Sequence, residues 1–169
     1  REINEEIIDY LKKEFKGDSI NVISPEFDVY RKRNGITEIP DNHILDKEKL
    51  RSRVKLNRFN WYYQQFLKYK LVLFFEDEET LIIDGDTIMK KEIVDVDTLL
   101  YTNWKMFQGY LNFNTRLIPE LYTKREKLVS FITNQMFFKK KYVKEILQLI
   151  EKETNTDWIN GIVKLINEA

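Results

Sequence analysis

The stretch Thr80-Leu81-Ile82-Ile83-Asp84-Gly85-Asp86-Thr87 carries the strongest structural signal in the sequence. Its first four residues are β-branched or aliphatic, which is typical of a buried strand in a mostly parallel sheet. Two aspartates separated by a glycine follow at once. Because ligands of open α/β sheets bind at the carboxyl ends of the strands, this segment predicts an α/β fold with a site around Asp84 and Asp86.

Carboxylates in this position suit Mg²⁺ or Mn²⁺, which take oxygen ligands and bridge to phosphates. Alternate residues of an ideal strand lie about 6.6 Å apart, whereas two ligands of one such cation lie within roughly 4.2 Å of each other. The backbone therefore has to bend between Asp84 and Asp86, and Gly85 permits the bend. A plain Asp-Gly-Asp turn remains open as the competing interpretation. Unpaired carboxylates repel each other, so replacing either aspartate with Asn is expected to cost little stability in metal-free buffer.

Patterns on both sides of this stretch support an α/β fold. Residues 2–16 repeat apolar side chains at helical spacing, which predicts a helix, and residues 20–23 form a short strand after it. We expect strands 20–23 and 80–83 to be parallel neighbours or near-neighbours in one central sheet. The sequence opens directly in the helix pattern, without Met, so we expect residues 1–169 to be a single domain, truncated at its N-terminus and lacking its first strand.

Residues 26–46 follow neither periodicity and contain the turn-forming runs Asn34-Gly35 and Pro40-Asp41-Asn42. Structureless stretches of this length are uncommon in compact domains and are often functional. The segment therefore predicts a long irregular loop, poorly packed or mobile without ligand, that borders the site after the strand.

Three further helices are expected in the rest of the chain. In the first, Phe59, Tyr63, Phe66 and Lys70 are expected to lie on one face, and Leu71–Phe75 is either the end of this helix or a strand. The second covers residues 142–152. The third carries an apolar stripe from Trp158 to Ile166 and is expected to be capped by Thr154 or Thr156.

The composition restricts partners and compartment. Twenty-eight basic and 28 acidic residues give a net charge of zero, whereas duplex-binding proteins usually carry a basic excess, so no nucleic-acid partner is expected. The basic runs Arg31-Lys32-Arg33 and Lys139-Lys140-Lys141 are expected to be solvated surface, with peripheral membrane contact as the alternative. Cysteine is absent, which removes disulfides and thiolate zinc sites. The longest apolar run, Leu71–Phe75, is far below the ~20 residues of a membrane span, and we expect a cytoplasmic protein.

Two other segments place polar side chains among apolar ones. They are Asn60-Trp61-Tyr62-Tyr63-Gln64-Gln65-Phe66-Leu67-Lys68 and Ser130-Phe131-Ile132-Thr133-Asn134-Gln135-Met136-Phe137-Phe138. Gln, Asn and Lys side chains can hydrogen-bond the hydroxyls of a nucleotide or a sugar, although amphipathic surface is the commoner role of such residues.

Taken together and in this order, the three segments resemble a bacterial and archaeal family of glycosyltransferases with the GT-A fold. The family has a Trp-x-x-Gln-Gln-x-x-Lys helix, which is matched by Trp61, Gln64, Gln65 and Lys68. It then has an apolar strand ending in Asp-x-Asp-Thr, which is matched by Asp84, Asp86 and Thr87. A later Ser-Phe-Ile-x-x-x-Met segment is matched by Ser130, Phe131, Ile132 and Met136. The resemblance covers roughly residues 20–168, and the ordered set is what makes it specific.

The resemblance implies a mostly parallel GT-A-like sheet flanked by helices, and transfer of a sugar from a nucleotide-diphosphate donor to a glycan or another acceptor. It implies that Mn²⁺ or Mg²⁺ is held by Asp84 and Asp86 and neutralises charge on the leaving diphosphate, as a Lewis acid. The implied donor-binding residues are Trp61, Gln64, Gln65, Lys68, Asp84, Asp86, Asn134 and Gln135. No catalytic base stands out. Asn134-Gln135 occupies the place where the resemblance leads us to expect a histidine, so no histidine metal ligand is carried over.

Two other functions are left open. A phosphatase of the haloacid dehalogenase type also places Asp-x-Asp after an apolar strand, but it needs Thr or Val four residues after the first Asp, where this chain has Ile88. A GT-A-like binding domain could keep the fold without catalysis. Hydrolysis of a nucleotide sugar would separate the enzyme from the binding domain.

Overall fold

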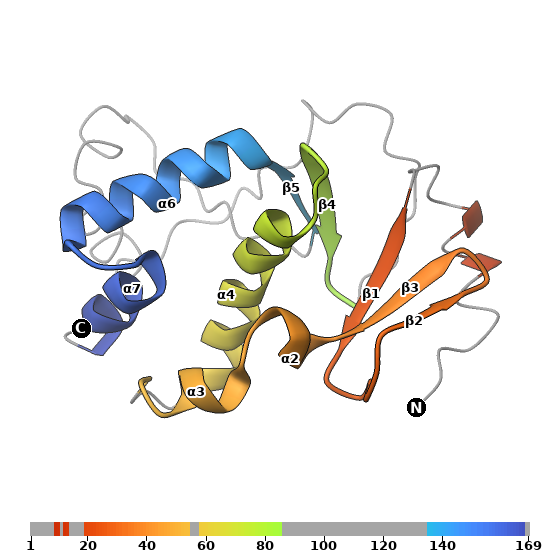
Figure 1. Ribbon diagram of the computed structural model, residues 1–169, viewed down its shortest axis with the longest axis horizontal. Coiled ribbons are helices and arrows are strands. Elements are labelled where there is room, and N and C mark those ends of the chain that lie inside the picture. The colour runs from red at the N-terminus through yellow and green to blue at the C-terminus, as the bar shows by residue number, and fades with distance from the viewer. Residues whose placement is uncertain (1–8, 11, 14–18, 55–57, 86–134, 168–169) are drawn as a thin grey trace. The chain divides into compact units, whose positions relative to one another are not determined.

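The computed structural model describes residues 9, 10, 12, 13, 19–54, 58–85 and 135–167 (Figure 1). Their helices and strands form a mixed α/β structure. The chain divides into two compact units, residues 1–47 with 88–94 and residues 48–87 with 95–169. Each unit has secondary structure and buried residues of its own.

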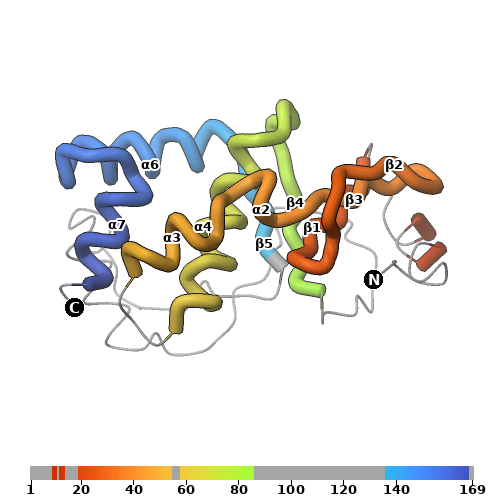
Figure 2. Tube along the Cα trace, turned by 60° about the horizontal axis from the view of Figure 1, so that its bottom comes forward, coloured from red at the N-terminus to blue at the C-terminus, as the bar shows by residue number. Residues whose placement is uncertain are grey.

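The first unit holds a three-stranded sheet in the order β1-β3-β2, with β1 at Ile20–Ser24, β2 at Arg31–Arg33 and β3 at Ile36–Pro40. β1 pairs with β3 in parallel, and β2 pairs with β3 antiparallel. Figure 2 traces the chain through these three strands. The strand predicted over residues 20–23 is confirmed. Of the predicted helix 2–16, residues 9, 10, 12 and 13 are described and helical, and the others lie outside the described residues.

The irregular loop predicted over residues 26–46 is wrong, because this segment contains β2, β3 and the short helix α2 (Asp41–Ile44). Asn34 and Gly35 join β2 to β3 with φ angles of 50° and 77°. Two successive positive φ angles are characteristic of the tight turn that Asn-Gly forms in a hairpin. Every residue of β3, the central strand of this sheet, is buried, and its β-branched residues Ile36, Thr37 and Ile39 favour a strand. The predicted border with Asp84 concerns both units and stays a prediction.

The second unit begins with residues 48–51 of α3 (Lys47–Arg51), whose first residue belongs to the first unit. It contains α4 (Phe59–Phe74), β4 (Glu79–Ile83), β5 (Gln135–Lys139), α6 (Lys140–Thr154) and α7 (Trp158–Asn167). β4 and β5 form an antiparallel pair, from Glu79 opposite Lys139 to Ile83 opposite Gln135. Figure 1 shows α6 leaving β5 directly and α7 folding back from the far end of α6.

The expectation of one sheet holding residues 20–23 and 80–83 is not met within the described part of the chain, where β1 and β4 belong to separate sheets. β4 is paired antiparallel, and Thr80–Ile83 are half-buried rather than buried. The parallel pairing among the described strands is that of β1 with β3. An aliphatic run is compatible with either strand direction, so the pattern alone could not assign the partner.

α6 and α7 confirm the two predicted C-terminal helices. Val143, Leu147 and Ile150 are buried along one face of α6. The cap of α7 is Asp157, whose Oδ1 accepts the backbone N–H of Asn160 at 3.1 Å. The predicted caps, Thr154 and Thr156, are therefore wrong, since an aspartate directly before the first helical residue is better placed for this bond.

α4 is buried on two opposite faces. Phe59, Tyr63 and Phe66 lie on the face predicted for them, where the Phe66 ring lies 5.8 Å from that of Trp158 in α7, centroid to centroid. The run Leu71–Phe75 turns out to be the end of this helix, which reaches Phe74. The opposite face is buried at Lys68, Leu71 and Val72, and it was not predicted. Within the described residues, none of the helices has the length and apolar character needed to cross a bilayer.

Candidate functional site

The structure joins two of the predicted site residues, Lys68 of α4 and Asp84, which directly follows β4. The Nζ atom of Lys68 lies 2.8 Å from Oδ1 of Asp84. The side chain of Lys68 is 8% exposed and that of Asp84 is 23% exposed. The contact is therefore a charge-assisted hydrogen bond, and the carboxylate offsets the desolvation of an ammonium that has little access to water.

The local structure explains why these side chains meet. Side chains alternate along a strand, so Thr80 and Asp84 lie on one face of β4 and its extension. Phe138 of β5 pairs with Thr80 and shares that face, and its ring lies 5.8 Å from the ring of Tyr69 in α4. This face of the two-stranded sheet is thus turned toward α4. Lys68 precedes Tyr69 in the helix and reaches Asp84 where the strand ends.

The other helix residues of the resemblance lie on the same face of α4 as Lys68. Trp61, Gln64, Gln65 and Lys68 are spaced i, i+3, i+4 and i+7, which places them in one row about 10 Å long. Gln64 is exposed, Trp61 and Gln65 are half-buried, and Lys68 is buried. The row therefore leads from the solvent to the ion pair. Its indole and amide groups can stack on, or hydrogen-bond to, a base or a sugar.

The remaining predicted site residues are described in part or not at all. Asp86 and Asn134 lie outside the described residues. Gln135 is described by its backbone, which pairs with Ile83 at the end of β4. The pairing of β4 with β5 therefore brings the backbone of Gln135 beside Ile83, the residue before Asp84.

Asp84 fits the chemistry of a ligand for Mg²⁺ or Mn²⁺. The ion pair engages Oδ1, and the partly exposed carboxylate carries a second oxygen, Oδ2. Mg²⁺ is commonly held by one or two carboxylates together with waters and phosphate oxygens. In the part of the chain that the structure describes, no group of three or more His, Asp or Glu side chains comes together to hold a metal. A cation here would take Asp84 as one oxygen ligand and add Lewis-acid charge beside a diphosphate.

The expectation that the carboxylates are unpaired is wrong for Asp84, because Lys68 neutralises it. Lysine is almost always exposed unless paired, so its residue type did not indicate burial. A signal was nevertheless present, since Lys68 shares a helix face with the aliphatic residues Leu71 and Val72. A lysine within such an apolar stripe needs an anion within reach, and the partly exposed Asp84 supplies it.

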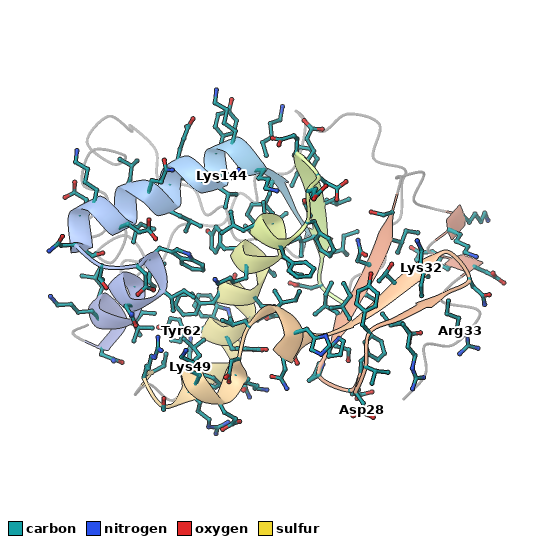
Figure 3. All side chains as sticks on the ribbon, in the orientation of Figure 1. Asp28, Lys32, Arg33, Lys49, Tyr62 and Lys144 are labelled. Carbon is teal, nitrogen blue, oxygen red and sulfur yellow. The ribbon has the colours of Figure 1, made fainter. Side chains whose placement is uncertain are left out.

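The two basic runs differ from each other. Arg31 and Lys32 are exposed on the edge strand β2, as predicted for solvated surface, and Figure 3 labels Lys32 beside Arg33 there. Lys139 and Lys141 are also exposed. Lys140 instead has a structural role. Its Nζ donates to the backbone carbonyl of Phe75, and its backbone N–H donates to the backbone carbonyl of Glu78 at 2.8 Å.

No family model, no curated protein and no solved structure matches this chain. A function for it has to be argued from its own residues and contacts.

Proposed function

We propose that this chain is a glycosyltransferase domain that transfers a sugar from a nucleotide-diphosphate donor with the help of Mn²⁺ or Mg²⁺. The observation that carries the proposal is the contact between Lys68 and Asp84 at 2.8 Å. These residues belong to two separate motifs of the glycosyltransferase family that the sequence resembles. Motifs that serve one site have to lie together in the fold, and the contact between Lys68 of α4 and Asp84 after β4 supports a common site for these two.

The groups around this contact suit a nucleotide-diphosphate donor. An ammonium group binds phosphate oxygens as a point charge, and a carboxylate holds the cation that bridges a diphosphate. The helix row from Trp61 to Gln65 adds aromatic and amide groups at the solvent end of the same face. We place the diphosphate at Lys68 and Asp84, and the rest of the donor along this row. The proposal also includes a mostly parallel GT-A-like sheet, a glycan or another acceptor, and a cytoplasmic location.

A thermal-shift panel of nucleotide sugars, each with and without Mn²⁺, tests the proposal. We expect one donor class to raise the melting temperature only when Mn²⁺ is present. At a donor concentration of 100 times Kd the gain is about 2.7 kcal/mol, which corresponds to roughly 5–10 °C for a chain of this size. Asp84→Asn should lose this gain, measured against its own melting temperature without ligand.

Asp77→Asn is the matched control, because it removes the same charge from the exposed segment before β4 and should keep the gain. Release of nucleoside diphosphate from the stabilising donor then separates an enzyme from a binding domain. A panel without any Mn²⁺-dependent shift would contradict the proposal. An equal gain in the parent and in Asp84→Asn would remove Asp84 from the donor site.

A further inference from the structure

We propose that Lys68 and the divalent cation compete for Asp84, and that a bound diphosphate resolves the competition by drawing Lys68 away. The inference rests on the proposed function, since it concerns the cation and the diphosphate of that reaction. It starts from the ion pair, in which the Lys68 ammonium takes a place on the Asp84 carboxylate that a metal charge would take.

Competition follows from the charges and from the burial of Lys68. A cation on Asp84 would stand a few ångströms from the ammonium, and like charges repel more strongly where water is excluded. Lys68 has little access to water as an escape, because its side chain is 8% exposed. Of its neighbours on the helix face, Leu71 and Val72 are apolar and 5% and 0% exposed, and Gln64 and Gln65 carry no charge, so none of them offers another anion. The cation alone should therefore bind weakly while Lys68 has no other anion.

A diphosphate supplies that other anion. The ammonium has three donors on a flexible stem, so it can pass from a carboxylate to phosphate oxygens without a change of the helix. Lys68 stands at the buried end of the row that also holds Trp61, Gln64 and Gln65. Once Lys68 binds the diphosphate, both oxygens of Asp84 are released to the cation. Cation and diphosphate then strengthen each other's binding beyond their direct contact.

The test measures Mn²⁺ binding to the whole chain by titration calorimetry, with Mn²⁺ alone and with Mn²⁺ plus inorganic pyrophosphate as the diphosphate probe. Lys68→Met removes the charge and keeps an unbranched side chain. We expect Mn²⁺ alone to bind this variant at least about tenfold more tightly than the parent, because the repulsion is gone. Pyrophosphate should then strengthen Mn²⁺ binding less in the variant than in the parent.

Lys144→Met is the matched control, since Lys144 is an exposed lysine of α6 (Figure 3), and it should leave Mn²⁺ binding unchanged. Equal or weaker binding of Mn²⁺ alone by Lys68→Met, in a protein whose parent binds Mn²⁺ with pyrophosphate, overturns the competition and leaves the proposed function standing. A parent that binds neither Mn²⁺ nor pyrophosphate overturns both.

A measurement on the parent keeps the inference testable if Lys68→Met does not fold. Acylation of lysines with acetic anhydride, read by peptide mass spectrometry, reports whether the Lys68 ammonium is engaged. Saturating Mn²⁺ alone should increase acylation of Lys68, and added pyrophosphate should suppress it again. Acylation of Lys68 that does not respond to Mn²⁺ overturns the competition.

Discussion

Asp84 and Lys68 depend on each other for charge compensation. Removing one member of a buried ion pair leaves the other desolvated and without attraction, which destabilises more than replacing both by apolar residues. For Asp84→Asn we expect the free energy of unfolding to fall by about 1–3 kcal/mol in metal-free buffer. The loss is smaller than for a fully buried pair because the Asp84 side chain is 23% exposed and Asn still accepts a hydrogen bond. Urea denaturation measures it.

Asp77→Asn, in the exposed segment before β4, should change the free energy of unfolding by no more than about 0.5 kcal/mol. Combining Asp84→Asn with Lys68→Met should destabilise by less than the sum of the two single changes, because the second change removes the ammonium that the first leaves unpaired. An Asp84→Asn protein as stable as the parent would show that the ion pair contributes nothing to folding.

Thr80 carries a second polar group that matters for stability. Its Oγ1 is buried and, among the described side chains, has no hydrogen-bond partner. An unsatisfied buried hydroxyl retains its desolvation penalty, and valine has the same shape without the hydroxyl and favours strands. Thr80→Val should therefore raise the free energy of unfolding by about 1 kcal/mol.

The same substitution at Thr154 provides the control for Thr80→Val. The Thr154 hydroxyl donates to the carbonyl of Ile150 at 2.6 Å, so Thr154→Val removes a bond and should not stabilise. Urea denaturation of both variants shows whether the free energy of unfolding rises in Thr80→Val and fails to rise in Thr154→Val. A loss of stability in Thr80→Val would mean that its hydroxyl has a partner in solution.

Among the elements, the β2–β3 hairpin depends most on its turn. Gly35 has a φ of 77°, which residues with a Cβ adopt only at a cost. A Cβ at this position would lie 3.5 Å from Cε of Lys12, an ordinary contact, so the expected effect comes from the backbone. Gly35→Ala should lower the free energy of unfolding by about 1–2 kcal/mol.

Gly85→Ala is the control at the element scale, because a Cβ there meets no heavy atom within 4 Å and its φ is not positive. Thermal melting of the two variants compares them, and Gly35→Ala should have the lower melting temperature. Equal melting temperatures would contradict the role of the Asn34-Gly35 turn in holding β3 in its place.

At the scale of the whole molecule, each compact unit is built around residues that water does not reach. Ile36 and Ile39 of β3 are each 1% exposed in the first unit, and Val72 of α4 is 0% exposed in the second. α4 joins the elements of its unit, since its aromatic residues contact Phe138 of β5 and Trp158 of α7. Lys68 of the proposed site shares a helix face with Leu71 and Val72, which are 5% and 0% exposed, so one element serves both the core and the site.

The sequence by itself determined the features that depend on neighbours within a few residues. The apolar repeats at helical spacing predicted α4, α6 and α7, and β-branched runs predicted β1 and β4, because these periodicities follow from local backbone geometry. The shared helix face of Trp61, Gln64, Gln65 and Lys68 is equally local. β3 could also have been recognised from its Asn-Gly turn and the β-branched residues after it.

Tertiary structure alone decided which segments meet. β4 could have paired with a parallel or an antiparallel strand, and its partner β5 lies far along the chain. The burial of Lys68 and its contact with Asp84 depend on how α4 packs on that pair of strands. Such contacts join residues of different helices and strands, and a local pattern of residue types does not encode them. The sequence therefore predicted the groups of the candidate site, whereas the ion pair that joins them came from the packing of the second unit.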